Sequence, residues 1–168
     1  MVRAGLVALG LAGASGCSLI LDWSPGAIPI DAPFDAPYSR EDCAYKEPND
    51  TAATAALITP DDTGPAGICP KDPPDYDFYR FTVPAGTTQV SVRVTFAGAN
   101  GDIDVRIMDA AGATTIGESR GLGDEEAVVC PGSSPTCPML AAGDYVLEVF
   151  AGKPNAVNRY SFELKLEP

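Results

Sequence analysis

Five oxygen-bearing side chains lie in two short blocks of the sequence. The first block is Glu47-Pro48-Asn49-Asp50, and the second runs from Asp75 to Asp77. Calcium takes about six to eight hard oxygen ligands in irregular geometry, and carboxylates, an Asn carbonyl and backbone carbonyls of turns can supply them. We therefore predict a calcium site with the ligands Glu47, Asn49, Asp50, Asp75 and Asp77. In the alternative interpretation, the first block caps a short helix and the second is a solvated turn.

Asp102 and Asp104 form another carboxylate pair with two-residue spacing. On a strand, such a pair points to one side with its members roughly 6.5 to 7 Å apart, a separation that glycoside hydrolysis can use. That chemistry also needs a cleft and a carboxyl of raised pKa, and we expect neither in a compact domain with short loops. A solvated strand face is the preferred interpretation of this pair.

The sequence contains no histidine. Catalysis by an imidazole base and zinc sites with histidine ligands are therefore excluded. We expect a protein that is not an enzyme, and a small hydrolase that uses only carboxylates is the alternative.

Four cysteines follow Cys17, namely Cys43, Cys69, Cys130 and Cys137. An even number of cysteines in an exported protein indicates disulfides, and four cysteines allow three pairings. A zinc site with four thiolates is the disfavoured alternative, because the cysteine spacings lack the close-set pairs of such sites. The segment from Cys130 to Cys137 is short and rich in turn residues, so its ends should lie close together. We therefore predict the pairs Cys130–Cys137 and Cys43–Cys69.

Residues 1–16 have the three parts of a secretory signal: a positive start, a short apolar run and small residues before Cys17. The tetrapeptide Ala14-Ser15-Gly16-Cys17 resembles the bacterial lipobox, which implies that Cys17 carries the lipid. We expect an extracytoplasmic protein held by this lipid to the cell envelope, at the outer membrane. Residues 17–42 are rich in Pro, Ala and Asp and predict an extended tether.

The remaining chain shows the two-residue alternation of half-buried strands. Val90, Val92 and Val94 alternate with polar residues, and the same pattern recurs around Phe81 and Val105 and in the last two strands, near Leu147 and Phe162. Turn residues separate these segments, and an Ala-rich run from residue 49 to 57 predicts a turn or two of helix. The fold class predicted for residues 43–168 is an all-β antiparallel sandwich of jelly-roll type.

The formal net charge of −12 limits the partners that the protein can bind. A surface of this sign repels phosphate backbones and anionic headgroups, which argues against nucleic acid and against membrane binding by charge. The same charge favours a bound dication.

Several blocks of this sequence, in this order, resemble the bacterial pre-peptidase C-terminal domain. They are Glu47 to Thr51, Asp75 to Phe81, Gly101 to Ile107, Leu140 to Val149 and Tyr160 to Phe162. The resemblance covers residues 43–168 and implies a β-sandwich in which the two acidic blocks pack together, with calcium where the chain enters the sandwich. It implies a non-catalytic binding or spacer module, with a protein or polysaccharide as the possible ligand. A purely structural envelope protein is a further alternative.

Overall fold

The computed structural model describes residues 38–132 and 137–168. All of them belong to one compact unit, Phe34–Pro168. The predicted signal peptide, Cys17 and residues 17–37 of the predicted tether lie outside the described residues. Among the described residues, no helix is both long and apolar enough to cross a membrane.

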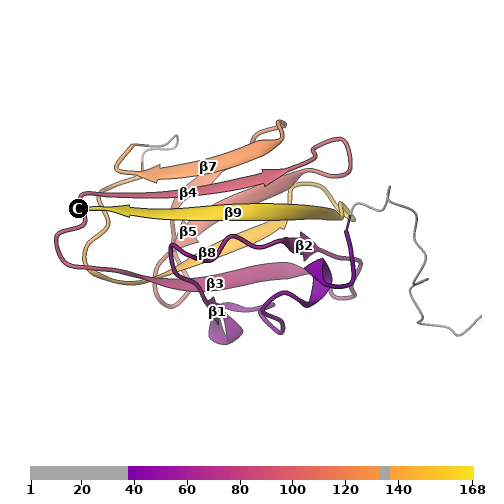
Figure 1. The fold of residues 1–168 in the computed structure, drawn as a ribbon, viewed down its shortest axis with the longest axis horizontal. Helices are drawn as coiled ribbons and strands as arrows, with labels where there is room; N and C mark the ends of the chain where they lie inside the picture. The colour runs from indigo at the N-terminus through magenta and orange to yellow at the C-terminus, as the bar shows by residue number, and fades with distance from the viewer. Residues whose placement is uncertain (1–37, 133–136) are drawn as a thin grey trace, which may run out of the picture. The chain divides into compact units, whose positions relative to one another are not determined.

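The described residues contain nine strands, which form two sheets that pack face to face (Figure 1). The five-stranded sheet has the order β1-β3-β8-β5-β6 and the four-stranded sheet the order β2-β9-β4-β7. The strands are β1 (Ala56–Leu57), β2 (Ala66–Ile68), β3 (Tyr76–Val83), β4 (Gln89–Phe96), β5 (Ile103–Met108), β6 (Thr115–Ser119), β7 (Glu125–Cys130), β8 (Gly143–Ala151) and β9 (Asn158–Glu167). All neighbours pair antiparallel except β1 and β3, which are parallel.

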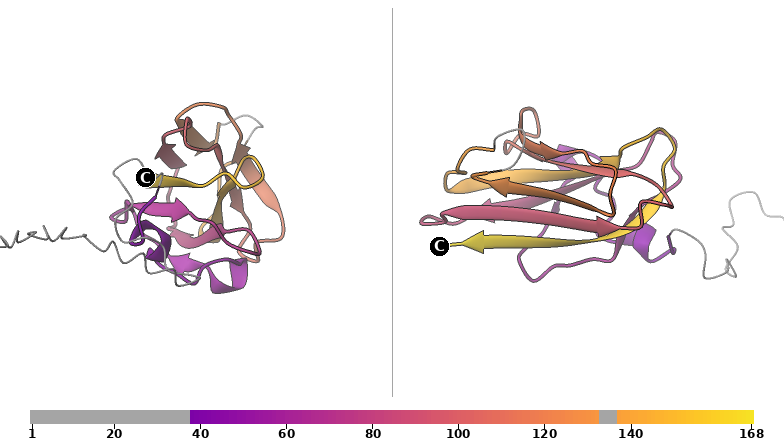
Figure 2. Two further views of the ribbon diagram at one scale, coloured as in Figure 1. Left: turned by 90° about the vertical axis from the view of Figure 1, so that its right-hand side faces the viewer. Right: turned by 90° about the horizontal axis from the view of Figure 1, so that it is seen from above.

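The strand order is that of a jelly roll. From β2 onward, β2, β4, β7 and β9 contribute to one sheet, and β3, β5, β6 and β8 to the other. Successive strands therefore cross between the sheets repeatedly, as in two nested Greek keys. The predicted antiparallel sandwich is confirmed, and Figure 2 shows the two sheets as stacked layers.

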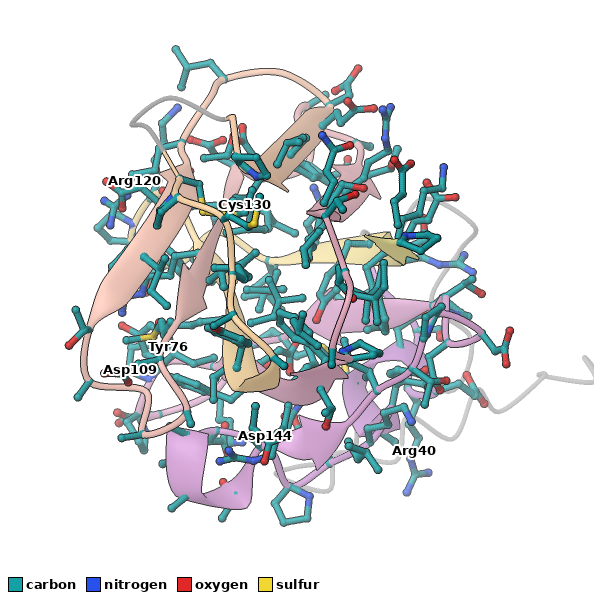
Figure 3. All side chains as sticks on the ribbon, turned by 90° about the vertical axis from the view of Figure 1, so that its left-hand side faces the viewer. Arg40, Tyr76, Asp109, Arg120, Cys130 and Asp144 are labelled. Atoms are coloured by element: carbon teal, nitrogen blue, oxygen red, sulfur yellow. A yellow bond between two sulfur atoms is a disulfide. The ribbon has the colours of Figure 1, made fainter. Side chains whose placement is uncertain are left out.

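The two-residue alternation places one face of each long strand in the core. Val90, Val92 and Val94 of β4 are at most 1% exposed, whereas Arg93 and Thr95 between and after them are exposed. Phe81 of β3 is fully buried and its ring stacks on Tyr145 of β8 at 5.9 Å. Viewed along the sandwich, the side chains fill the space between the sheets (Figure 3). Burial of these apolar side chains is the main stabilisation of the fold.

Within residues 38–132 and 137–168, the helical content is limited to two short 3-10 turns, η1 (Asp42–Ala44) and η2 (Ala52–Thr54). The cap of η2 is Thr51 and not a residue of the first acidic block, because the Thr51 hydroxyl accepts from the N–H of Thr54. Asn49 is instead fully buried and Asp50 forms an ion pair. The interpretation of the first acidic block as a helix cap therefore does not hold.

Both predicted disulfides are confirmed. Cys43 of η1 pairs with Cys69 just after β2, and Cys130 at the end of β7 pairs with Cys137. The first bridge fastens the segment that precedes the sandwich to the edge of the four-stranded sheet.

Candidate metal centre

The two acidic blocks meet at the start of β3. The backbone N–H of Phe78 donates to the carbonyl oxygen of Asn49 at 2.9 Å, which aligns the first block with this strand. Asp75, immediately before β3, accepts through Oδ2 from the backbone N–H of Cys69 at 2.7 Å. Asp77 is the second residue of β3 and is 2% exposed. Segments that lie far apart in the sequence thus deliver their acidic side chains to one place.

Three carboxylates form the centre of this site. One oxygen atom from each of Glu47, Asp75 and Asp77 lies within 4.8 Å of the other two. Asp75 and Asp77 are buried, and Glu47 is half-buried. Oε2 of Glu47 accepts from the backbone N–H of Asn49 at 2.8 Å. Such a spacing lets one cation contact all three groups.

Two buried side chains of this site have polar atoms without a hydrogen-bond partner among the described residues. They are Oδ1 and Nδ2 of Asn49 and Oδ1 of Asp75. Leaving a buried polar atom unsatisfied costs about 1 to 3 kcal/mol, and native structures contain few of them. Two of the three atoms are oxygens, so the residues present fit a hard cation such as calcium.

A hydrogen-bonded pair of tyrosines supports Asp77 from the core. The hydroxyl of Tyr160, on β9 of the opposite sheet, donates to Oδ2 of Asp77 at 2.5 Å. The hydroxyls of Tyr160 and Tyr79 lie 2.7 Å apart. These contacts orient Asp77 and join the site to both sheets.

Asp50 lies at the solvent side of the site and is paired with Lys71. The ammonium Nζ of Lys71 is 2.5 Å from each carboxylate oxygen of Asp50 and 3.7 Å from Oδ1 of Asp75. Sequence analysis missed Lys71 and Tyr160. Lys71 could have been found, because it is a single lysine in the acidic segment before Asp75. Tyr160 could not, because it is 83 residues from Asp77 and no local pattern connects the two.

Burial changes the proton affinity of these carboxyls. Desolvation raises the pKa of Asp75 to about 6, although the N–H of Cys69 and the charge of Lys71 act in the opposite direction. Desolvation raises the pKa of Asp77 to about 8, against the hydrogen bond from Tyr160, and the charges of Asp75 and Glu47 add to the increase. Without a bound cation, Asp77 therefore favours its protonated form near neutral pH, whereas Asp75 becomes protonated only in mildly acidic solution.

The raised pKa values predict how stability without a cation depends on pH. Both folded-state pKa values lie above the unfolded value of 3.8, so the folded protein holds these two protons more tightly than the unfolded chain does. The stability that this provides is complete below about pH 4 and is lost as the pH rises through about 6 and then about 8. In chelator, the melting temperature should fall as the pH rises across this range. In Asp77→Asn the melting temperature should change less around pH 8 than it does in the wild type. The check is a series of thermal melts in chelator. A wild-type melting temperature that increases from pH 6 to pH 8 would contradict the prediction.

The structure corrects the interpretation of Asp104. Its side chain is not on a solvated strand face but is 5% exposed, on the outer face of β5 opposite Phe150 of β8. The guanidinium of Arg120 lies 5.1 Å from the Phe150 ring. Desolvation, with the charge of Asp102, raises the pKa of Asp104 to about 6 while Arg120 lowers it. The outer face of this sheet is thus partly covered by its own long side chains.

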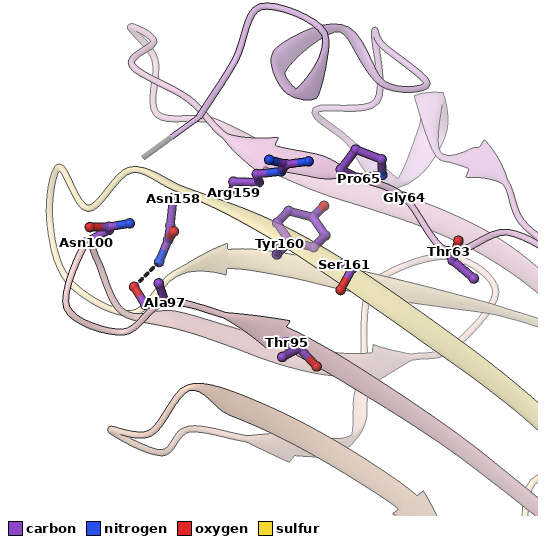
Figure 4. A pocket seen from close by; sticks show the side chains of 10 residues that line it. All are labelled: Thr63, Gly64, Pro65, Thr95, Ala97, Asn100, Asn158, Arg159, Tyr160 and Ser161. Atoms are coloured by element: carbon purple, nitrogen blue, oxygen red, sulfur yellow. Dashed lines mark hydrogen bonds between the residues drawn. The ribbon is translucent and has the colours of Figure 1, made fainter. Parts of the chain in front are cut away.

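A pocket of about 550 Å³ lies beside β4 and β9 (Figure 4). Its lining comprises Thr63, Gly64, Pro65, Thr95, Ala97, Asn100, Asn158, Arg159, Tyr160 and Ser161. Asn158 is held by a hydrogen bond of 2.7 Å to the carbonyl oxygen of Ala97. No carboxylate is among these lining residues. The pairs Asp75/Asp77 and Asp102/Asp104 therefore do not line this pocket, whereas glycoside hydrolysis would need two carboxyl groups beside the bound substrate.

Part of the chain matches a known domain family. Residues 75–151 match the family model described as bacterial pre-peptidase C-terminal domain. The crystal structure of the pre-peptidase C-terminal domain of collagenase from Bacillus anthracis superposes with a TM-score of 0.52 at 15% identity, covering 66% of this chain and 94% of that chain. The resemblance seen in the sequence and the sandwich fold are thereby confirmed.

Another solved structure is less similar. The periplasmic inhibitor of g-type lysozyme, PliG, from Aeromonas hydrophila gives a TM-score of 0.36 at 14% identity, covering 66% of this chain and 96% of that chain. A comparison with curated proteins finds no match.

Proposed function

We propose that this pre-peptidase C-terminal domain is a non-catalytic spacer module of the cell envelope, stabilised by calcium where its N-terminal segment joins β3. One observation carries the calcium proposal. Buried oxygens of Asn49 and Asp75 lack hydrogen-bond partners among the described residues, beside three carboxylates whose oxygens lie within 4.8 Å of one another. The two disulfides support an extracytoplasmic location, because such bonds persist in oxidising compartments.

Glu47, Asp75 and Asp77 would hold the ion with their carboxylates, Asn49 with its carbonyl, and Asp50 from the solvent side. When bound, calcium supplies two positive charges and about six to eight coordination positions. The Glu47-to-Asp50 segment would supply some of the ligands, and Asp75 and Asp77 at the start of β3 would supply the others. Binding of one ion by both segments would hold the first segment against the sheet. This arrangement suits a domain that must keep a fixed connection to the chain preceding it.

The calcium proposal predicts a ligand-dependent melting temperature. Extracellular sites of this kind bind with dissociation constants of about 10⁻⁴ to 10⁻³ M, and a hundredfold excess of ion over that constant stabilises the fold by roughly 2.7 kcal/mol. The wild type should therefore melt several degrees higher in calcium than in chelator. Asp50→Ala should reduce this difference and Asp77→Ala should abolish it.

Glu163→Ala is the matched control, since Glu163 is an exposed carboxylate of β9 whose partner is Lys165. It should retain the full calcium response. Equal melting temperatures of the wild type with and without a large excess of calcium would refute the calcium site.

The proposed envelope location depends on Cys17, which lies outside the described residues. Its support is the signal-like sequence 1–16 with small residues before the cysteine. Mass spectrometry of the membrane fraction should find an acylated amino terminus at Cys17, and Cys17→Ser should leave the precursor uncleaved. An unmodified mature protein that starts at another residue would contradict the anchor.

We prefer the spacer role to ligand binding because of the aromatic residues next to the site. Tyr76 is 39% exposed, but its cross-strand neighbour Phe150 is only 9% exposed. The guanidinium groups of Arg106 and Arg120 lie 5.2 and 5.1 Å from the Phe150 ring. A broad exposed aromatic surface, which would favour a protein or polysaccharide ligand, is therefore not formed by this pair.

A further inference from the structure

Lys71 places a positive charge directly on the candidate ligands. It lies in the segment between the Cys43–Cys69 disulfide and β3, and its side chain is 39% exposed. Its ammonium Nζ is within 2.5 Å of both oxygens of Asp50 and 3.7 Å from Oδ1 of Asp75. The other nearby lysine, Lys46, pairs instead with Asp62 at 2.9 Å.

The ammonium contacts the carboxylates that calcium would need. Both oxygens of Asp50 accept hydrogen bonds from the ammonium of Lys71, so they cannot coordinate a cation fully while this pair persists. At 3.7 Å, Nζ is too far from Oδ1 of Asp75 for a normal hydrogen bond, yet close enough for charge attraction. The ammonium thus balances charge at the site but leaves the buried oxygen of Asp75 unsatisfied.

The position of Lys71 also permits its removal without unfolding the domain. The side chain is long and partly exposed, so a change of rotamer can carry the ammonium into solvent. Glu47, Asp75 and Asp77 remain in place because backbone groups and Tyr160 hold them. A dication, which can approach several buried oxygens at once, is a better partner for these groups than one ammonium.

We propose that Lys71 is an internal competitor of calcium, which neutralises the site when the ion is absent and must leave Asp50 and Asp75 for the ion to be fully coordinated. This inference depends on the proposed function and adds the control of affinity to it. Loss of the lysine charge has two opposite consequences. Calcium binds more tightly, and the calcium-free protein becomes less stable because its carboxylates repel one another without compensation.

The test uses Lys71→Met, which retains the aliphatic chain and removes the charge. Calorimetric titration with calcium should give a dissociation constant about tenfold lower than that of the wild type, the change expected for a charge-assisted contact. In chelator, the variant should melt a few degrees lower than the wild type, and in saturating calcium it should melt no lower. Lys71→Gln should behave in the same way.

Lys46→Met is the matched control, because it removes a lysine whose ion pair lies outside the carboxylate cluster. Its dissociation constant should change by less than about twofold, the effect of a partly exposed charge at a distance. Unchanged or weaker calcium binding by both Lys71 variants, with a wild type that binds calcium, would overturn the competitor role and leave the proposed function intact. A wild type that binds no calcium would overturn both.

Discussion

The double variant Cys43→Ala/Cys69→Ala is expected to lose about 3.5 kcal/mol of unfolding free energy, because the bridge joins residues 26 apart and closing a loop of that length restricts the unfolded chain by this amount. Both cysteines are only partly buried, so little of the loss should come from packing. Urea denaturation of the oxidised wild type and of the variant, both in chelator, measures the difference. A loss below about 1 kcal/mol would contradict this prediction.

The same variant should also weaken calcium binding. The Cys43–Cys69 bridge lies next to both ligand blocks, and the N–H of Cys69 donates to Asp75. The matched control is Cys130→Ala/Cys137→Ala, which removes a bridge between residues 7 apart at another part of the sandwich. This control should lose stability but retain the calcium affinity of the wild type. Equal affinity losses in the two double variants would show that the position of the first bridge has no special role.

The second large effect is expected at the ion pair between Arg106 and Glu148, on the outer face of the five-stranded sheet. Nε of Arg106 donates to Oε2 of Glu148, whose side chain is 2% exposed. Arg106→Met should destabilise the fold by about 3 kcal/mol, because it leaves a buried carboxylate without its partner. Arg106→Met/Glu148→Met should recover most of this loss, since it removes both charges and keeps apolar volume.

Arg93 and Glu125 form a matched exposed pair on the other sheet. Their atoms lie 2.6 Å apart, but their side chains are 54% and 44% exposed. Arg93→Met should therefore cost less than about 1 kcal/mol. The two double-mutant cycles, measured by denaturant unfolding, separate the effect of burial from that of ion-pair formation. A coupling energy for Arg106 and Glu148 no larger than that for Arg93 and Glu125 would contradict the prediction.

The candidate metal centre and the Cys43–Cys69 bridge reinforce the same part of the domain. Only a short stretch of chain separates Cys43 from Glu47 and Cys69 from Asp75. The bridge therefore limits how far the two ligand blocks can separate, and it lowers the entropy lost when they gather around an ion. The competitor role inferred for Lys71 opposes this preorganisation and would keep the affinity within the range of extracellular calcium concentrations.

The sequence by itself determined the longer strands, the fold class and both disulfide pairs. It also indicated that Glu47, Asp75 and Asp77 lie together, but it grouped Asp50 with them, whereas Asp50 pairs with Lys71. The strands and the Cys130–Cys137 pair depend on local information. Successive side chains of a strand point to opposite faces, so the alternation at Val90, Val92 and Val94 shows which face of β4 is buried. This conclusion does not depend on which strands pair with β4. The short segment from Cys130 to Cys137 constrained that pairing through chain length alone.

Only the tertiary structure decided which distant groups meet. The strands β1 and β2, of two and three residues, are too short for a periodic signal and form because longer strands offer them hydrogen bonds. Asp104 is buried because register places it opposite Phe150, and Lys71 reaches Asp50 across 21 residues. Tyr160 supports Asp77 because β9 and β3 face each other across the core. Such contacts depend on strand order, register and sheet packing, which local periodicity does not encode.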